Sequence, residues 1–203
     1  MEWAGGRSML SSPPAGLDRA DIIDIFMANP QVAKIFRRLP ELGVAPCWIA
    51  GGAIVQTVWN HMTGRAPDYG IADYDLIYFD RSHDYAAEDR VIRRADTLFQ
   101  GAGITVEVKN QALVPYWYRR RFGCYYPAIT SALESLHRYP TMPSSMAVTI
   151  RQGRPELYAP FGLKDILAFR VRPNRRLPQR EAYNRKTARW AAAWPELTII
   201  PWD

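Results

Sequence analysis

Two stretches decide the predicted fold: Cys47 to Asn60, CWIAGGAIVQTVWN, and Asp73 to Asp80, DYDLIYFD. The short apolar run that ends at Ala50 is typical of a β-strand, and Gly51-Gly52 interrupts it. From Ala53 onward the apolar residues recur with a helical period. The first stretch therefore predicts a strand, a glycine turn and a helix, and the second predicts another strand.

Two aspartates open the second predicted strand. Asp73 and Asp75 are separated by one residue, so both carboxylates leave the same face, with Cα atoms roughly 6.5 Å apart. Carboxylates at that spacing can hold one hard cation between them. Gly51 and Gly52, at the start of the predicted helix, offer backbone N–H groups and the positive end of a helix dipole to a phosphate. Together these features predict metal-assisted transfer of a nucleotidyl group. The alternative is a cluster at a turn or strand edge that binds nothing.

Four amide side chains lie near this predicted site. Gln56 and Asn60 are four residues apart and share a second face of the predicted helix. Asn110 and Gln111 follow a third predicted strand, Ile104 to Lys109. Amides can contact the base or sugar of a nucleotide, or can close a turn. We expect Gln56, Asn60, Asn110 and Gln111 to bind the nucleotide.

Several blocks, in this order, resemble the polymerase-β nucleotidyltransferase superfamily, and within it a group of small nucleotidyltransferase-family proteins. The similarity covers roughly Gln31 to Asp203. The blocks are Gly51 to Asn60, Asp73 to Asp80, Val108 to Ala112, Ala159 to Leu163, Val171 to Asn174, and Arg189-Trp190 to Trp194-Pro195. The resemblance implies an α+β fold with a small mixed β-sheet flanked by helices and a basic helical C-terminal part. Leu113 and Pro115 depart from the family pattern, in which arginine and histidine are common.

The resemblance also implies a third carboxylate on a neighbouring strand. Glu107 is the candidate, because Thr105, Glu107 and Lys109 alternate with apolar residues along the third predicted strand. Adjacent strands lie about 4.8 Å apart, so Glu107 could reach the cation held by Asp73 and Asp75. The cation expected is Mg²⁺ or Mn²⁺. The alternative is an ordinary exposed strand face.

The net charge of +6 is unevenly distributed. Residues 164–189 carry nine Lys/Arg and two Asp/Glu. This excess favours a polyanionic partner, a nucleotide or a nucleic acid, although a solvated basic helix would show the same pattern. Residues 116–121, YWYRRR, also join aromatic to basic side chains. They could stack a base and bind phosphate, or form an amphipathic helix with buried rings.

The composition excludes several classes of protein. Cys47 and Cys124 are too few for a disulfide framework and lack metal-ligand spacing, which favours a reducing cytoplasm. The N-terminus lacks the apolar core of a signal peptide. Residues 42–64 carry no Asp, Glu, Lys or Arg, but the glycines, Pro46 and polar side chains within them argue against a membrane span. We expect a cytoplasmic protein.

The rest of the chain is predicted as a flexible leader over 1–17, a nucleotidyltransferase-like domain over 18–160 and a basic helical extension over 161–203 that packs on it. Further helices are expected from Asp18 or Asp21 to Ala28, after Pro30, from Ser82 to Gln100, and over 127–138, 163–169 and 180–194. A strand over 146–150 and its hairpin partner over 156–158 are also expected.

The sequence thus predicts an enzyme, a nucleotidyltransferase that transfers a nucleoside monophosphate from a triphosphate such as ATP. The acceptor stays open among RNA, a protein and a small molecule. The alternatives are an inactive module that binds nucleotide or RNA, and an antitoxin-like interaction protein on the same fold.

Overall fold

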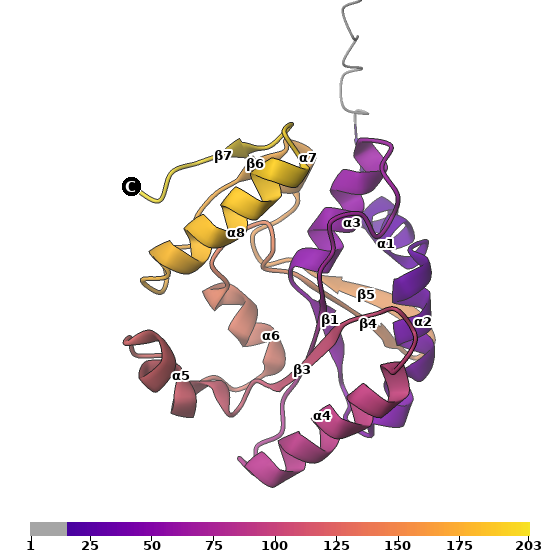
Figure 1. Ribbon diagram of the computed structural model, residues 1–203, viewed down its shortest axis with the longest axis vertical. Coiled ribbons are helices and arrows are strands. Elements are labelled where there is room, and N and C mark those ends of the chain that lie inside the picture. The colour runs from indigo at the N-terminus through magenta and orange to yellow at the C-terminus, as the bar shows by residue number, and fades with distance from the viewer. Residues whose placement is uncertain (1–15) are drawn as a thin grey trace, which may run out of the picture.

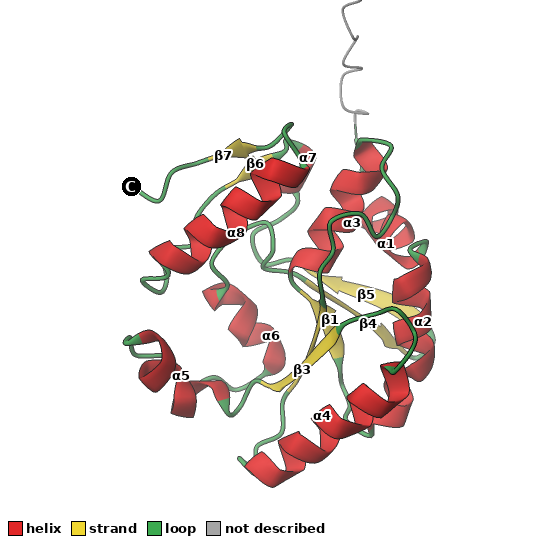
Figure 2. Ribbon diagram, in the orientation of Figure 1, coloured by secondary structure: helices red, strands yellow, loops and turns green. Residues whose placement is uncertain are grey.

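The computed structural model describes residues 16–203, and its centre is a five-stranded mixed sheet of order β3-β2-β1-β4-β5 (Figures 1 and 2). The strands are β1 (Trp48–Ala50), β2 (Tyr74–Tyr78), β3 (Val106–Asn110), β4 (Ala147–Arg151) and β5 (Arg154–Tyr158). Strand β1 is antiparallel to both β2 and β4, whereas β2 and β3 are parallel. Strands β6 (Arg170–Val171) and β7 (Thr198–Ile199) form a separate parallel pair.

The helices and 3₁₀ turns are distributed along the whole described chain. They are α1 (Arg19–Met27), α2 (Pro30–Arg38), η1 (Leu39–Leu42), α3 (Gly52–Met62), α4 (Tyr85–Phe99), α5 (Val114–Phe122), α6 (Ala132–Ser135), η2 (Leu136–Arg138), α7 (Lys164–Leu167) and α8 (Arg180–Ala193). Over residues 16–203, no helix combines the length and the apolar character needed to cross a bilayer.

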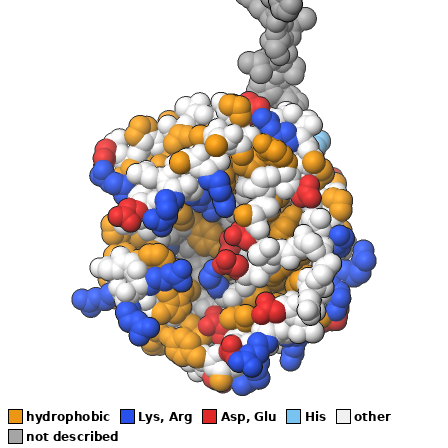
Figure 3. Space-filling model, viewed as in Figure 1, with side chains coloured by type: hydrophobic (Ala, Val, Ile, Leu, Met, Phe, Trp, Pro, Cys, Tyr) orange, Lys and Arg blue, Asp and Glu red, His pale blue; other side chains and the backbone are white. Residues whose placement is uncertain are grey.

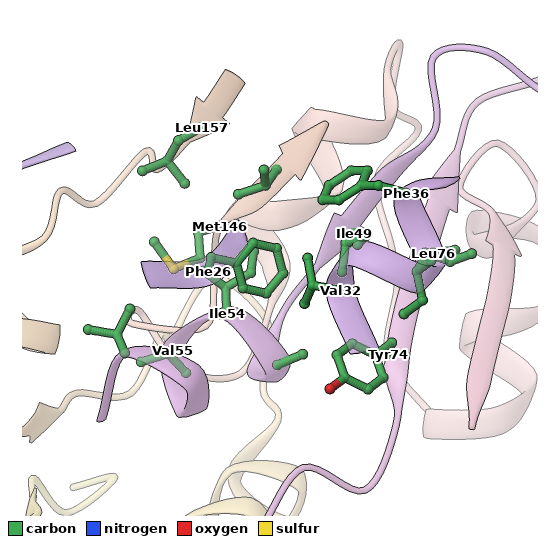
Figure 4. Close-up of a cluster of buried hydrophobic side chains, with 14 of the residues drawn as sticks. Phe26, Val32, Phe36, Ile49, Ile54, Val55, Tyr74, Leu76, Met146 and Leu157 are labelled. Carbon is green, nitrogen blue, oxygen red and sulfur yellow. The ribbon is translucent and has the colours of Figure 1, made fainter. Parts of the chain in front are cut away.

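Helices α1 to α4 cover one face of the sheet. Figure 4 shows Phe26 of α1, Val32 of α2 and Ile54 of α3 packed with Ile49 of β1 and Leu76 of β2. These side chains are fully buried. Burying a large aliphatic or aromatic side chain contributes about 1.5–3 kcal/mol, so this cluster supplies the main driving force for folding. Helix α3 is buried on every side between residues 52 and 60, because other elements also cover its far side.

The opposite face of the sheet is only partly covered. Trp48, Ile77 and Ala147 pack under α6 and η2, and α5 packs in a separate small cluster around Tyr118 and Tyr126. Side chains alternate along a strand, so Asp75 shares this face with Ile77. The partly open face therefore carries the acidic residues that the sequence singled out.

Most of the expected elements are present, but two helices begin later than expected and one pair of strands was not expected. Helix α4 begins after Asp84, whose carboxylate accepts the N–H of Ala86, whereas Ser82 donates to Asp80. Residues 127–131 are not helical, and Ser131 caps the short α6 instead. Neither β6 nor β7 was expected, because two-residue strands leave no periodicity. The predicted leader over 1–17 lies almost wholly outside the described residues.

The C-terminal part packs on α3 through tryptophans. Trp59 of α3 contacts Trp190 of α8 edge-on, with ring centroids 5.1 Å apart, and contacts Trp194 at 5.8 Å. The indole N–H of Trp194 donates to Oδ1 of Asn60 at 3.0 Å, and Nδ2 of Asn60 donates to the carbonyls of Pro67 and Tyr69. The oxygen and the NH₂ group of this buried amide are thus all hydrogen-bonded within the protein.

The hydrogen bonds of Asn60 predict a structural role for it. Asn60→Ala removes one buried and two partly buried hydrogen bonds and leaves their partners unsatisfied, which should cost about 2–4 kcal/mol of unfolding free energy. Thermal denaturation measures this loss, with Asn184→Ala on the exposed side of α8 as the control. A stable Asn60→Ala protein that has lost nucleotide affinity would show instead that Asn60 contacts the ligand.

Candidate functional site

The turn after β1 lies against the carboxylate of Asp75. Ala50 is the register partner of Asp75, so Gly51, the next residue, begins the turn beside that side chain. Gly51 has φ +82° and ψ −139°, a conformation that glycine adopts readily and other residues avoid. A Cβ on Gly51 would lie 3.0 Å from Oδ2 of Asp75 and 3.3 Å from the Tyr139 ring. The turn therefore requires glycine both for its conformation and for its proximity to the carboxylate.

Helix α3 starts at Gly52 and directs its free backbone N–H groups into the same region. A Cβ on Gly52 would lie 3.6 Å from Nζ of Lys186, 3.5 Å from the Trp190 ring and 2.9 Å from Nε2 of Gln56. Oε1 of Gln56 and the indole N–H of Trp190 are buried and lack a hydrogen-bond partner among the described residues. The start of α3 is thus a polar, positively charged environment suited to an anion.

Lys109 lies between two of the three predicted carboxylates. Asp75 and Glu107 are register partners on the parallel strands β2 and β3. Nζ of Lys109 is 2.6 Å from Oε2 of Glu107 and 3.9 Å from Oδ1 of Asp75. Its hydrogen bond and charge hold the pKa of Glu107 below its usual range. Glu107 is half exposed and directed to Lys109, so the lysine separates it from the pair Asp73 and Asp75.

Lys186 reaches the acidic residues from the other side, on α8. Burial lowers the pKa of its ammonium group, while Asp75 and Asp73 partly offset that effect. Burial likewise raises the pKa of Asp75, against the opposing influence of Lys109 and Lys186. Nζ of Lys186 also lies 5.1 Å from the centroid of the Trp190 ring. A lysine in this position supplies a positive charge at the start of α3 beside a carboxylate.

The donor set suits a divalent cation only in combination with a ligand. Within residues 16–203, no three His, Cys, Asp or Glu side chains are arranged to hold a metal ion. Mg²⁺, however, is usually held by one or two carboxylates together with substrate phosphates rather than by a complete protein cage. Asp75, beside the start of α3, and Asp73, two residues earlier, provide two carboxylates for such a site.

A hollow of about 230 Å³ opens onto this site. It is lined by Asp75, Lys109, Gln111, Trp117 and Lys186, among others. Figure 3 shows the corresponding depression on this face of the molecule, with acidic atoms beside it and basic side chains over α5 and α8 around its rim. The site is therefore open to a ligand that approaches between α5 and α8.

The structure distributes the predicted site residues between two groups. It brings Gly51, Gly52, Gln56, Asp73 and Asp75 together, and Gln111 lines the same hollow. In contrast, the side chain of Asn110 joins the ends of β2 and β3: it accepts from the N–H groups of Asp80 and Ala112 and donates to the carbonyl of Asp80. Asn60 is similarly occupied within the fold.

Three residues that line the hollow, Lys109, Lys186 and Gln179, were not predicted as site residues. Lys109 is two residues after Glu107 on the same strand, so the alternation that predicted the position of Glu107 also placed Lys109 on that face. Lys186 is three residues after Tyr183 and four before Trp190, so it falls on the buried stripe of α8, where an unpaired lysine is unusual. Gln179 precedes α8 in an irregular segment, where no periodic pattern in the sequence indicates which way a side chain points.

Comparisons with known proteins identify the family and a similar fold. A family model described as Nucleotidyltransferase matches residues 37–199. The fold resembles an NMR structure described as revealing a CCA-adding enzyme head domain, with a TM-score of 0.72 and 24% identity over 91% of this chain and 96% of the other. A sequence search among curated proteins finds no significant match. Because the family model spans most of the chain, this protein belongs to the nucleotidyltransferase family.

Proposed function

We propose that the protein transfers a nucleoside monophosphate from a nucleoside triphosphate to an acceptor hydroxyl. The observation that carries the proposal is the convergence of three groups: the glycine turn at the start of α3, the Asp75 carboxylate and the Lys186 ammonium. Phosphates need N–H donors and positive charge, and a phosphate-bound cation needs carboxylates. Membership of the nucleotidyltransferase family supports the same assignment.

In this proposal the triphosphate lies over Gly51 and Gly52. Neither residue has a Cβ, so phosphate oxygens can approach the backbone N–H groups of the first turn of α3. Lys186 neutralises phosphate charge from the α8 side, and the unpaired indole N–H of Trp190 is a further donor beside it. Gln56 and Gln111 are proposed to contact the nucleotide, since both border the same region.

Asp73 and Asp75 would hold Mg²⁺ or Mn²⁺ together with the phosphates. When bound, such an ion activates the attacking oxygen and stabilises the leaving pyrophosphate. Lys109 competes for the charge of Asp75, so a cation binds better when the triphosphate contributes ligands of its own. In the transfer, the acceptor oxygen bonds to the α-phosphorus and the bond to the β-phosphate oxygen breaks. Pyrophosphate leaves, and the hydroxyl proton passes to a carboxylate and then to water.

A second candidate function is a nucleotide-binding module without catalysis. The ion pair between Glu107 and Lys109 favours it, because this glutamate is engaged by a lysine rather than grouped with the aspartates. The family resemblance implied Glu107 as the third carboxylate, and that role stays a proposal. Both functions require triphosphate binding, and only the first requires release of pyrophosphate.

Replacing Asp75 tests the shared requirement. At triphosphate and Mg²⁺ concentrations about 100-fold above the dissociation constant, ligand binding should stabilise the wild type by about 2.7 kcal/mol. For a chain of this size that corresponds to roughly a 5–10 °C rise in melting temperature. Asp75→Asn should fold and lose this rise, because its amide cannot supply the anionic ligand. Asp96→Asn, an exposed position on α4, is the control. A rise as large as that of the wild type in Asp75→Asn would contradict the site.

Replacing Lys186 tests the contribution of α8. A charged hydrogen bond is worth about 1.5–3 kcal/mol, so Lys186→Met should weaken triphosphate binding roughly 10- to 100-fold. Calorimetric titration measures the affinity, and Lys164→Met on the exposed side of α7 is the matched control. Equal affinities for the two variants would remove Lys186 from the phosphate site.

Pyrophosphate release by the wild type, measured under the same conditions, separates the enzyme from the binding module.

A further inference from the structure

A groove extends outward from the proposed site between α5 and the start of α8. The hollow that contains Asp75 shares Tyr118, Pro140 and Gln179 with a second hollow of about 520 Å³. The second hollow is lined by Phe122 of α5 and, on the other side, by residues at the start of α8, among them Arg185. We call the two together the α5–α8 groove. The two hollows are adjacent, because the same three residues line both, and the inner one reaches Asp75.

Aromatic rings line the groove along the α5 side. Trp117, Tyr118 and Tyr126 border the inner hollow, and Tyr118 and Phe122 border the outer one. The Tyr118 ring lies 4.6 Å from Phe122 and 4.8 Å from Tyr126, centroid to centroid. Phe122 is nevertheless 47% exposed. A large apolar ring exposed at the mouth of a groove is suited to stack on a flat ligand.

Basic side chains lie on both sides of the groove, Arg121 against the rings of α5 and Arg185 on α8. Arg119, Arg120 and Arg121 are exposed, and none of the three forms an ion pair with another described residue. The Arg121 guanidinium lies over the rings of Trp117 and Phe122, at 5.9 and 5.5 Å from their centroids. Across the groove, Arg185 has one carboxylate nearby, that of Glu181 at 3.7 Å. The rim thus carries an excess of positive charge, which Figure 3 shows over α5 and α8.

The segment common to both hollows has a polar atom available for a ligand. Gln179 donates from Nε2 to the hydroxyl of Tyr118, while its Oε1 is buried without a partner among the described residues. Buried polar atoms are normally hydrogen-bonded, so an orphan acceptor in a groove is a candidate ligand contact. An N–H or O–H group of a base or sugar would satisfy it.

We propose that the α5–α8 groove binds the end of a single-stranded nucleic acid, which is the acceptor of the nucleotidyl group. The inference rests on the proposed function, because the groove leads to the triphosphate site. Stacking rings with arginines around them bind unpaired bases and the phosphates between them, independently of sequence. A duplex would keep its bases stacked on each other and leave the rings unused. The terminal hydroxyl would attack the α-phosphorus, lengthening the strand by one nucleotide and releasing pyrophosphate.

Fluorescence anisotropy with labelled twelve-nucleotide strands of RNA and DNA, and with a duplex, tests the binding without triphosphate or metal. The wild-type protein should prefer a single strand, and its affinity should fall steeply between 50 and 200 mM salt. Phe122→Leu keeps the apolar volume but removes the ring, and Arg185→Gln removes one charge. Each should weaken binding at least tenfold while leaving the melting temperature unchanged, and Arg185→Gln should also reduce the salt dependence.

Two variants on α4 are the matched controls and should bind like the wild type. Tyr85→Leu removes a ring that is 53% exposed, and Arg93→Gln removes an arginine paired with a carboxylate four residues earlier, as Arg185 is. Equal loss in the controls, duplex binding as tight as single-strand binding, or no binding at 50 mM salt would overturn the inference.

A strand-extension assay separates this inference from the proposed function. Lengthening of the oligonucleotide with release of pyrophosphate supports both. Release of pyrophosphate without binding or lengthening of any strand would overturn the nucleic-acid acceptor and leave the transferase standing. Groove-dependent binding of a strand that no triphosphate lengthens would overturn the acceptor role and favour the binding module.

Discussion

The antiparallel pairing of Ala50 with Asp75 is the constraint on which the site depends. It fixes where β1 ends relative to the acidic strand, so that the turn at Gly51 falls beside the Asp75 carboxylate. A slip of one residue would direct Asp75 into the core formed by Ile49 and Leu76 and would move Ile77 away from its partners. The alternation along β2 therefore sets both the buried face and the position of the carboxylate. Because Leu76 must face the core, Asp75 must face the opposite side of the sheet.

The packing of the C-terminal part brings a lysine to the acidic residues of the sheet. Asp75 and Glu107 lie on a partly covered sheet face near Asp73, and the charges of Asp73 and Glu107 disfavour the charge of Asp75. Lys109 from the sheet and Lys186 from α8 offset that repulsion. The tryptophan contacts between α3 and α8 hold Lys186 in place, with Trp59 and Trp190 edge to face. Carboxylates balanced by two lysines suit a site that binds both a cation and a phosphate. The cation can take the place of a lysine beside a carboxylate, and the phosphate can take the place of a carboxylate beside a lysine.

The sequence predicted the elements that have strong periodicity and missed those that depend on tertiary contacts. The strand, turn and helix around Gly51 were predictable because a short apolar run, a glycine pair and a helical stripe of apolar residues follow one another. The start of α4 was misplaced by a competing cap: Asp80 engages Ser82 locally, and Asp84 takes the capping role. For the site, the spacing of Asp73 and Asp75 predicted a carboxylate pair on one strand face; β2 begins at Tyr74, so only Asp75 lies within the strand and the pair stays a proposal. The engagement of Asn60 with Trp194, 134 residues away, was not, because a polar residue on a helix looks the same whether its partner is a ligand or a distant side chain.

The basic C-terminal segment illustrates how one composition can serve two purposes. From the sequence, an excess of Lys and Arg over 164–189 indicated either a polyanionic partner or a solvated helix. Those of these residues that lie on α8 differ in their place on the helix: Lys186 lies on the inward stripe between Tyr183 and Trp190, while Arg185 and Arg189 are exposed. Burial of the Lys186 ammonium group is costly: it lowers the pKa of this group, the charges of Asp75 and Asp73 offset it only in part, and among residues 16–203 no carboxylate lies within ion-pair distance. Solubility would be served equally by exposed arginines alone. The position of Lys186 therefore argues that α8 belongs to the site itself, and it is this helix that brings the outer arginines to the rim of the same groove.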